Sequence, residues 1–80
     1  MKRYIATFHT HLSALLTSRA LIGQGVSAQM MPVPRKLSAS CGTCVRYQAE
    51  EPMLSAMDAD VERVYEISQG DVYTPILENA

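Results

Sequence analysis

The sequence predicts an α+β domain of the ferredoxin-like βαββαβ type, in which one antiparallel sheet carries two helices on the same face. Three observations favour it. The chain has 80 residues, which leaves room for one small domain. Four segments are rich in β-branched or aromatic residues or alternate in polarity, and two helix-like segments separate them in the order of this fold. The second helix is expected to be short. We expect the domain to span residues 1–67, with a tail over residues 68–80.

The first strand and the first helix have clear local signals. Residues 3–8 (RYIATF) predict a strand because they alternate and contain aromatic and β-branched side chains. A helix is expected to start after Thr10, a possible N-cap, and to stop at Gly23 and Gly25. Its apolar residues recur at steps of three and four, which predicts one buried face. The members of that face are Leu12, Leu15, Leu16, Ala20 and Leu21.

The middle of the chain predicts an edge strand, a loop and a short strand. Residues 26–33 form the edge strand, because Pro32 cannot donate a hydrogen bond within a sheet. The small and polar residues that follow form a loop, and residues 44–48 form a third strand. Residues 50–57 predict the second helix, with Pro52 in its first turn.

The last part of the chain predicts a fourth strand and a tail of open role. Residues 61–67 (VERVYEI) alternate in polarity, as a strand with one buried face does. The tail has turn signals at Gly70 and Pro75. Its apolar residues could add a strand to the sheet or bury themselves against a second copy of the chain. A homodimer would help so short a chain, since small domains bury little of their surface.

Composition narrows the classes of function and location. Hydrophobic residues make up 48% and charged residues 19%, which is typical of a globular protein. The net charge of −1 argues against a protein that binds nucleic acid, because such binding needs a cationic surplus. No run of about 18 apolar residues suggests a membrane span. The polar N-terminus lacks the apolar core of a signal peptide, so we expect a cytoplasmic protein.

The predicted topology brings the chemically active residues to one end of the sheet. The loops after the first and second strands should share that end, because the intervening helix returns the chain to its starting side. The first loop carries His9 and His11. The second carries the candidate residues Arg35, Lys36, Ser38, Ser40, Cys41, Gly42 and Cys44, with Arg46 just beyond.

The two cysteines are spaced C-x-x-C, and a bridge between them would close too small a loop to stabilise the fold much. The two cysteines are therefore interpreted as a reactive pair and not as a structural disulfide, with Cys41 as the attacking thiolate and Cys44 as the resolving thiol. Arg35 and Arg46 would favour the thiolate. Gly42 would let the backbone approach a ligand closely.

Several alternatives stay open at this point. Cys44 could be a small buried apolar residue. Zinc could bind Cys41 and Cys44 together with His9 and His11, although no metal site is predicted, and the two His could equally belong to the helix entry. A thiol–disulfide switch would use both cysteines. A binding or regulatory module without covalent chemistry would use neither.

Three stretches, YIATFHTHLSALL, MPVPRKLSASCGTCVRY and VERVYEI, resemble the small selenium/sulfur carrier proteins over residues 3–67. The resemblance implies that Cys41, the Cys before Gly42, carries sulfur or selenium as a persulfide or selenosulfide. It places the motif's arginine and serines on Arg35, Ser38 and Ser40, whereas Cys44 stands where many members have an aliphatic residue. It also implies a carrier more than a turnover enzyme, with no cofactor. The expected donor is a cysteine desulfurase or a selenocysteine lyase, and the expected acceptor is selenophosphate synthetase.

Overall fold

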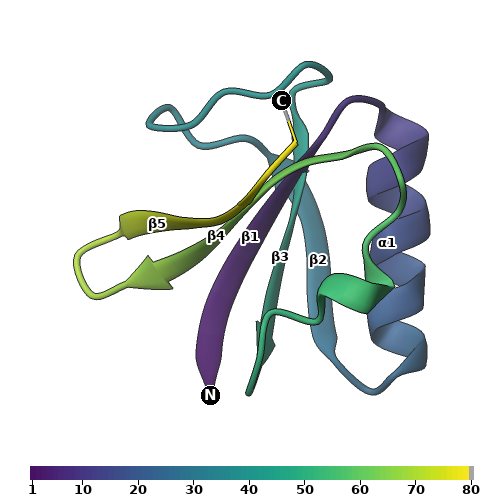
Figure 1. The fold of residues 1–80 in the computed structure, drawn as a ribbon, viewed down its shortest axis with the longest axis horizontal. Helices are drawn as coiled ribbons and strands as arrows, with labels where there is room; N and C mark the ends of the chain where they lie inside the picture. The colour runs from purple at the N-terminus through teal and green to yellow at the C-terminus, as the bar shows by residue number, and fades with distance from the viewer. Residues whose placement is uncertain (80) are drawn as a thin grey trace.

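The computed structural model describes residues 1–79 and contains one five-stranded antiparallel sheet with one long helix (Figure 1). The strands lie in the order β2-β3-β1-β4-β5, so β2 is an edge strand as predicted. This α+β arrangement is compatible with a ferredoxin-like fold. The elements are β1 (Lys2–Phe8), α1 (His11–Gly23), β2 (Ser27–Pro32), β3 (Thr43–Ala49), the 3-10 helix η1 (Leu54–Ala56), β4 (Val61–Ser68) and β5 (Val72–Glu78).

The central strand β1 divides the core into two clusters, one on each face of the sheet. Its residues Tyr4, Ala6 and Phe8 belong to a cluster that includes Leu21 of α1, so we call this side the helix face. The alternate residue Ile5 belongs to a smaller cluster on the opposite side, the back face. The other buried members of the back-face cluster are Cys44, Tyr65 and Ile67.

Helix α1 begins and ends where the sequence predicts. Thr10 caps it, because the Thr10 hydroxyl oxygen accepts a hydrogen bond from the Ser13 amide at 3.1 Å. The helix ends at Gly23, and Gly25 follows with φ of +82°, a conformation that favours glycine.

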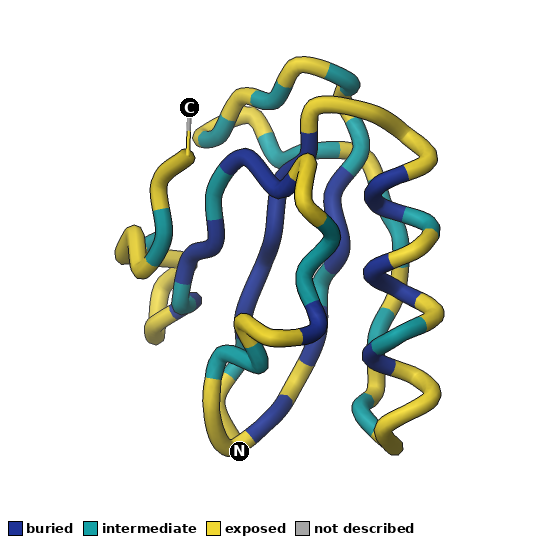
Figure 2. Tube along the Cα trace, turned by 45° about the vertical axis from the view of Figure 1, so that its right-hand side comes forward, coloured by how far each residue is buried: buried dark blue, intermediate teal, exposed yellow. Residues whose placement is uncertain are grey.

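The predicted buried face of α1 is confirmed at Leu21, which is fully buried, and at Ala20, which packs on the helix-face cluster, but it is wrong at Leu12 and Leu16. Leu12 and Leu16 are 61% and 44% exposed, whereas Ser13 and Thr17 are buried. Figure 2 shows buried positions, in dark blue, along the side of α1 that faces the sheet. The buried hydroxyls have partners in the segment before β4: the Ser13 hydroxyl donates to Asp58 Oδ2 at 2.8 Å, and the Thr17 hydroxyl accepts from the Asp58 amide at 3.0 Å. Large aromatic side chains on the sheet, including the stacked pair Tyr4 and Tyr47, already fill much of the helix-face core. The small side chains of Ser13 and Thr17 therefore fit between α1 and the segment around Asp58, and their hydroxyl groups remain hydrogen-bonded.

The predicted helix over residues 50–57 is also wrong. Only residues Leu54–Ala56 are helical, as a single 3-10 turn. Met53 precedes this turn in the left-handed conformation, with φ of +56°, and a right-handed helix cannot pass through such a residue. A helix of eight residues has little stability of its own, so tertiary contacts of the segment decide its conformation. One of these contacts is the hydrogen bond from the Tyr47 hydroxyl to the Pro52 carbonyl.

The tail adds a fifth strand, one of its two predicted roles. β5 pairs antiparallel with β4, and Arg63 lies opposite Glu78 with an ion pair at 3.7 Å. Val72 and Ile76 remain exposed on this edge strand. Homodimer formation through them stays a prediction, and the last residue of the predicted tail, residue 80, lies outside the described residues.

Within residues 1–79, no helix is both long enough and apolar enough to cross a membrane.

Candidate functional site

Two loops that are distant in sequence meet at one end of the sheet, next to the start of α1 (Figure 1). One follows β1, and the other, residues 33–42, joins β2 to β3. His9 Nδ1 lies 3.3 Å from the Ser40 hydroxyl oxygen, and His11 Nδ1 lies 3.3 Å from that of Thr43. The predicted convergence of the two loops is thereby confirmed.

The loop over residues 33–42 is closed at its base and held against the sheet. The Val33 amide donates to the Gly42 carbonyl at 3.1 Å. Gly42 has φ of +73°, which favours glycine at this position. Leu37 packs on the back-face cluster, and the Lys36 ammonium donates to the Asp71 carbonyl at 3.5 Å. The loop therefore extends across the back face as far as the turn between β4 and β5.

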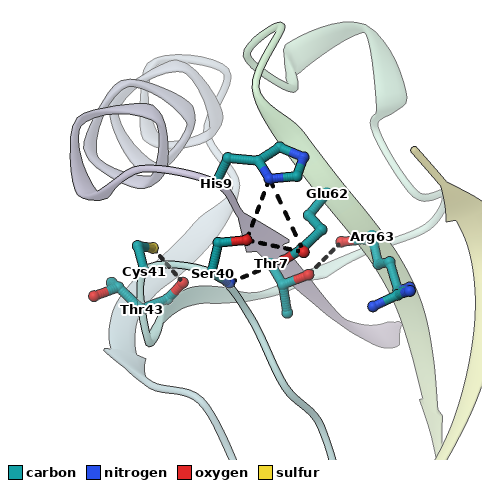
Figure 3. Close-up of polar contacts among 7 residues, drawn as sticks. All are labelled: Thr7, His9, Ser40, Cys41, Thr43, Glu62 and Arg63. Atoms are coloured by element: carbon teal, nitrogen blue, oxygen red, sulfur yellow. Dashed lines mark hydrogen bonds and ion pairs between the residues drawn. The ribbon is translucent and has the colours of Figure 1, made fainter. Parts of the chain in front are cut away.

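Glu62 clamps this loop immediately before Cys41 (Figure 3). One carboxylate oxygen accepts from the Ser40 amide at 3.3 Å, and the other accepts from the Ser40 hydroxyl at 3.2 Å. His9 Nδ1 lies 4.0 Å from the same carboxylate. The Glu62 residue is only 7% exposed, so these contacts satisfy a buried acceptor.

The sequence does not distinguish Glu62 from Glu66, which occupies an equivalent place in the alternating pattern of the fourth strand. The difference arises from a register shift between β1 and β4 at Thr7 and Phe8, where Phe8 pairs with Val61 instead of Glu62. Glu62 is left unpaired with β1 at this irregularity, beside the loop that carries Ser40. No signal in the sequence marks this irregularity.

The two cysteines occupy different environments, and both are free thiols. Cys41 is partly exposed, packs at the edge of the helix-face cluster, and directs its thiol to the Thr43 carbonyl at 3.5 Å (Figure 3). Cys44 is fully buried in the back-face cluster, with its sulfur 3.5 Å from the Met31 carbonyl oxygen. Burial raises the pKa of the Cys44 thiol to about 11. The sulfur atoms therefore pack against clusters on opposite faces of the sheet.

The remaining candidate residues do not all gather around Cys41. Arg35 and Ser38 are exposed in the loop and make no side-chain hydrogen bond or ion pair to another residue in the range 1–79. Arg46 lies opposite Ile5 in the pairing of β3 with β1, which places it on the back face with Cys44. Arg46 therefore shares a face with Cys44, and its expected effect on the Cys41 thiolate stays a prediction.

The four zinc ligands considered from the sequence are not assembled. His9 lies against Ser40 and Glu62, His11 lies against Thr43, and Cys44 is on the back face. Within the described part of the chain, no three His, Cys, Asp or Glu side chains are grouped to hold a metal ion.

Comparison with known proteins places the chain in a family. The family described as "Putative Se/S carrier protein-like" matches residues 3–66, and the chain belongs to this family. No curated protein and no solved structure matches the chain.

Proposed function

We propose that this protein carries sulfur or selenium on Cys41, as a persulfide or selenosulfide. The observation that carries the proposal is the contrast between the partly exposed Cys41, in a clamped loop, and the fully buried Cys44. Membership of a family named for selenium and sulfur carriage supports the general role. The assignment to Cys41 rests on its accessibility, because a carrier thiol has to meet the active sites of its partners.

The proposed loading step is a thiol–persulfide exchange. The Cys41 thiolate attacks the outer sulfur of a persulfide on the donor enzyme, and a new sulfur–sulfur bond forms on Cys41. The bond between the donor's two sulfurs breaks, and its inner sulfur leaves as a thiolate with the electron pair. The outer sulfur keeps its oxidation state, so the step needs no added oxidant or reductant. Delivery to an acceptor thiolate is the same reaction in reverse.

The surroundings of Cys41 suit such an exchange. The Glu62 clamp on Ser40 fixes the backbone next to Cys41, while Gly42 and Ser40 are themselves exposed. The partial exposure of Cys41, between two exposed neighbours, supports access for a partner. We propose a cysteine desulfurase or a selenocysteine lyase as the donor and selenophosphate synthetase as the acceptor.

The test is to load the protein with a cysteine desulfurase and cysteine, and to locate the added sulfur by mass spectrometry under non-reducing conditions. Wild-type protein and Cys44→Ala should each gain one sulfur atom on Cys41, and Cys41→Ser should gain none. The same comparison separates the alternatives. A thiol–disulfide switch requires both cysteines, so a Cys44→Ala protein that no longer loads would contradict the carrier role. Absence of sulfur from all three proteins would favour a binding module without covalent chemistry.

A further inference from the structure

A polar hollow lies on the back face of the sheet, between the edge strand β2 and its neighbour β3. Its volume is about 260 Å³. Strand pairing places Gln29 opposite Arg46, and Ser27 opposite Gln48. Arg46 and Gln48 lie two and four residues after Cys44 in β3, so they point to the same face of the sheet as Cys44, which is the back face. Gln29 and Ser27 lie directly opposite them in β2 and therefore point to that face as well. The hollow is lined by Ser27, Ala28, Gln29, Arg46, Tyr47 and Gln48.

The side chains that face the hollow are rich in hydrogen-bond donors. Ala28 and Tyr47 direct their side chains into the helix-face core, which leaves one guanidinium, two carboxamides and one hydroxyl. A guanidinium offers five N–H donors and each carboxamide offers two. No carboxylate lines the hollow. Such a set fits an anion with several acceptor oxygens better than a cation or an apolar group.

Arg46 differs from the other two arginines on this face. Arg63 forms an ion pair with Glu78 at 3.7 Å, and Arg3 donates to the Ser68 carbonyl at 3.3 Å. Arg46 is half-buried and has no ion pair or side-chain hydrogen bond to any residue in the range 1–79. A half-buried guanidinium without a partner leaves favourable charge-assisted hydrogen bonds unmade.

We infer that this hollow binds a small oxyanion, either an organic carboxylate or an inorganic oxyanion. The Arg46 guanidinium donates hydrogen bonds to two oxygens of the anion, and Gln29, Gln48 and Ser27 donate to the others. Neighbouring strands lie about 5 Å apart and same-face residues about 7 Å apart, so the four side chains surround a small molecule and not a macromolecule. β2 is an edge strand, so the hollow is open to solvent along one side. The site lies on the face opposite the Cys41 thiol and goes beyond the proposed carrier function.

The experiment is an NMR titration of the full chain that follows backbone amides, with inorganic phosphate and with malate as separate probes. Sodium chloride at matched ionic strength is the reference. We expect saturable shifts for residues 27–29 and 46–48, with a Kd on the order of 1 mM or lower for at least one probe. Binding of phosphate alone indicates an inorganic ligand, and binding of malate alone indicates a carboxylate. Binding of both supports the shared oxyanion chemistry.

Two variants and one matched control decide whether the hollow is the site. Arg46→Gln should weaken binding by at least about tenfold, since it removes the charge-assisted bonds. Gln48→Glu should also weaken it, because the new carboxylate competes for Arg46. Arg63→Gln, on the same face but outside the hollow, should leave the Kd unchanged. The inference is overturned if neither probe gives saturable shifts, or if Arg46→Gln binds as tightly as the wild type. Sulfur loading of Cys41 is a separate measurement, so either result is independent of the carrier proposal.

Discussion

Cys41 and Cys44 are separated by two residues, and they differ in almost every physical property that governs a thiol. Cys41 precedes β3 and is partly exposed, whereas Cys44 is the second residue of β3 and is fully buried. The start of β3 at Thr43 causes the difference, because strand residues alternate between the two faces of the sheet. A C-x-x-C spacing therefore does not by itself make two cysteines a working pair.

The difference also bears on the disulfide alternative. Cys41 contacts the helix-face cluster and Cys44 belongs to the back-face cluster. Cys44 is the second residue of a strand that pairs with β1 on one side and β2 on the other, whereas Cys41 precedes that strand. A Cys41–Cys44 bridge would therefore have to form at a fully buried sulfur. The disulfide alternative needs Cys44 to become accessible, whereas the carrier role needs only Cys41.

The contrast between the two cysteines predicts, first, a large difference in their alkylation rates. In the native protein at neutral pH, iodoacetamide should modify Cys41 and leave Cys44 unmodified over the same period. A rise in the Cys44 pKa from 9.0 to about 11 lowers its thiolate fraction about hundredfold, and burial blocks access as well. Peptide mass spectrometry against time measures both rates. In denaturant the two cysteines should react alike, and similar rates in the native protein would contradict the contrast.

The next effect is a loss of stability at alkaline pH. Below about pH 9, Cys44 is protonated in both the folded and the unfolded chain, so its burial has no ionisation cost. As the pH rises from 9.0 to about 11, the unfolded chain releases this proton while the folded protein keeps it. The free energy of unfolding should therefore fall by about 2 kcal/mol across that interval.

Urea unfolding at several pH values measures this fall, and Cys44→Ala is the matched variant because it should remove most of it. Burial also raises the pKa of Tyr4 and of Tyr47, whose contributions have the same sign at higher pH. Equal slopes for the wild type and Cys44→Ala between about pH 9 and pH 11 would show that Cys44 is not held protonated by the fold.

The smallest effect concerns the clamp that holds the Cys41 loop. Glu62→Ala should reduce the free energy of unfolding by about 1–2 kcal/mol, because the Ser40 amide and hydroxyl lose their acceptor. Hydrogen exchange at the Ser40 amide should accelerate, and the alkylation rate of Cys44 should stay unchanged. Glu62→Gln is the matched control, since its amide retains one acceptor oxygen and should show a smaller change. Unaltered exchange at Ser40 in Glu62→Ala would contradict the clamp.

Local signals in the sequence are sufficient to predict most of the helices and strands. Alternation identified β1 and β4, the Thr10 cap and Gly23 bounded α1, and Pro32 indicated an edge strand. The prediction of a helix over residues 50–57 is wrong because the helical signals of this segment are weak and Met53 adopts a left-handed conformation in the folded chain. Short segments follow their tertiary contacts more than their propensities.

Periodicity, caps and short connections act locally, so they predict the order of α1 and the first four strands along the chain, and the meeting of the His9 and Cys41 loops. Which side chains face one another depends on how the segments pack in the folded chain. The shifted register of β1 and β4 brings Glu62 to Ser40, and strand parity separates Arg46 and Cys44 from Cys41. Ser13 and Thr17 of α1 are buried with hydrogen bonds to Asp58, and Leu12 is left exposed. These outcomes depend on packing between segments distant in sequence, which no local pattern contains.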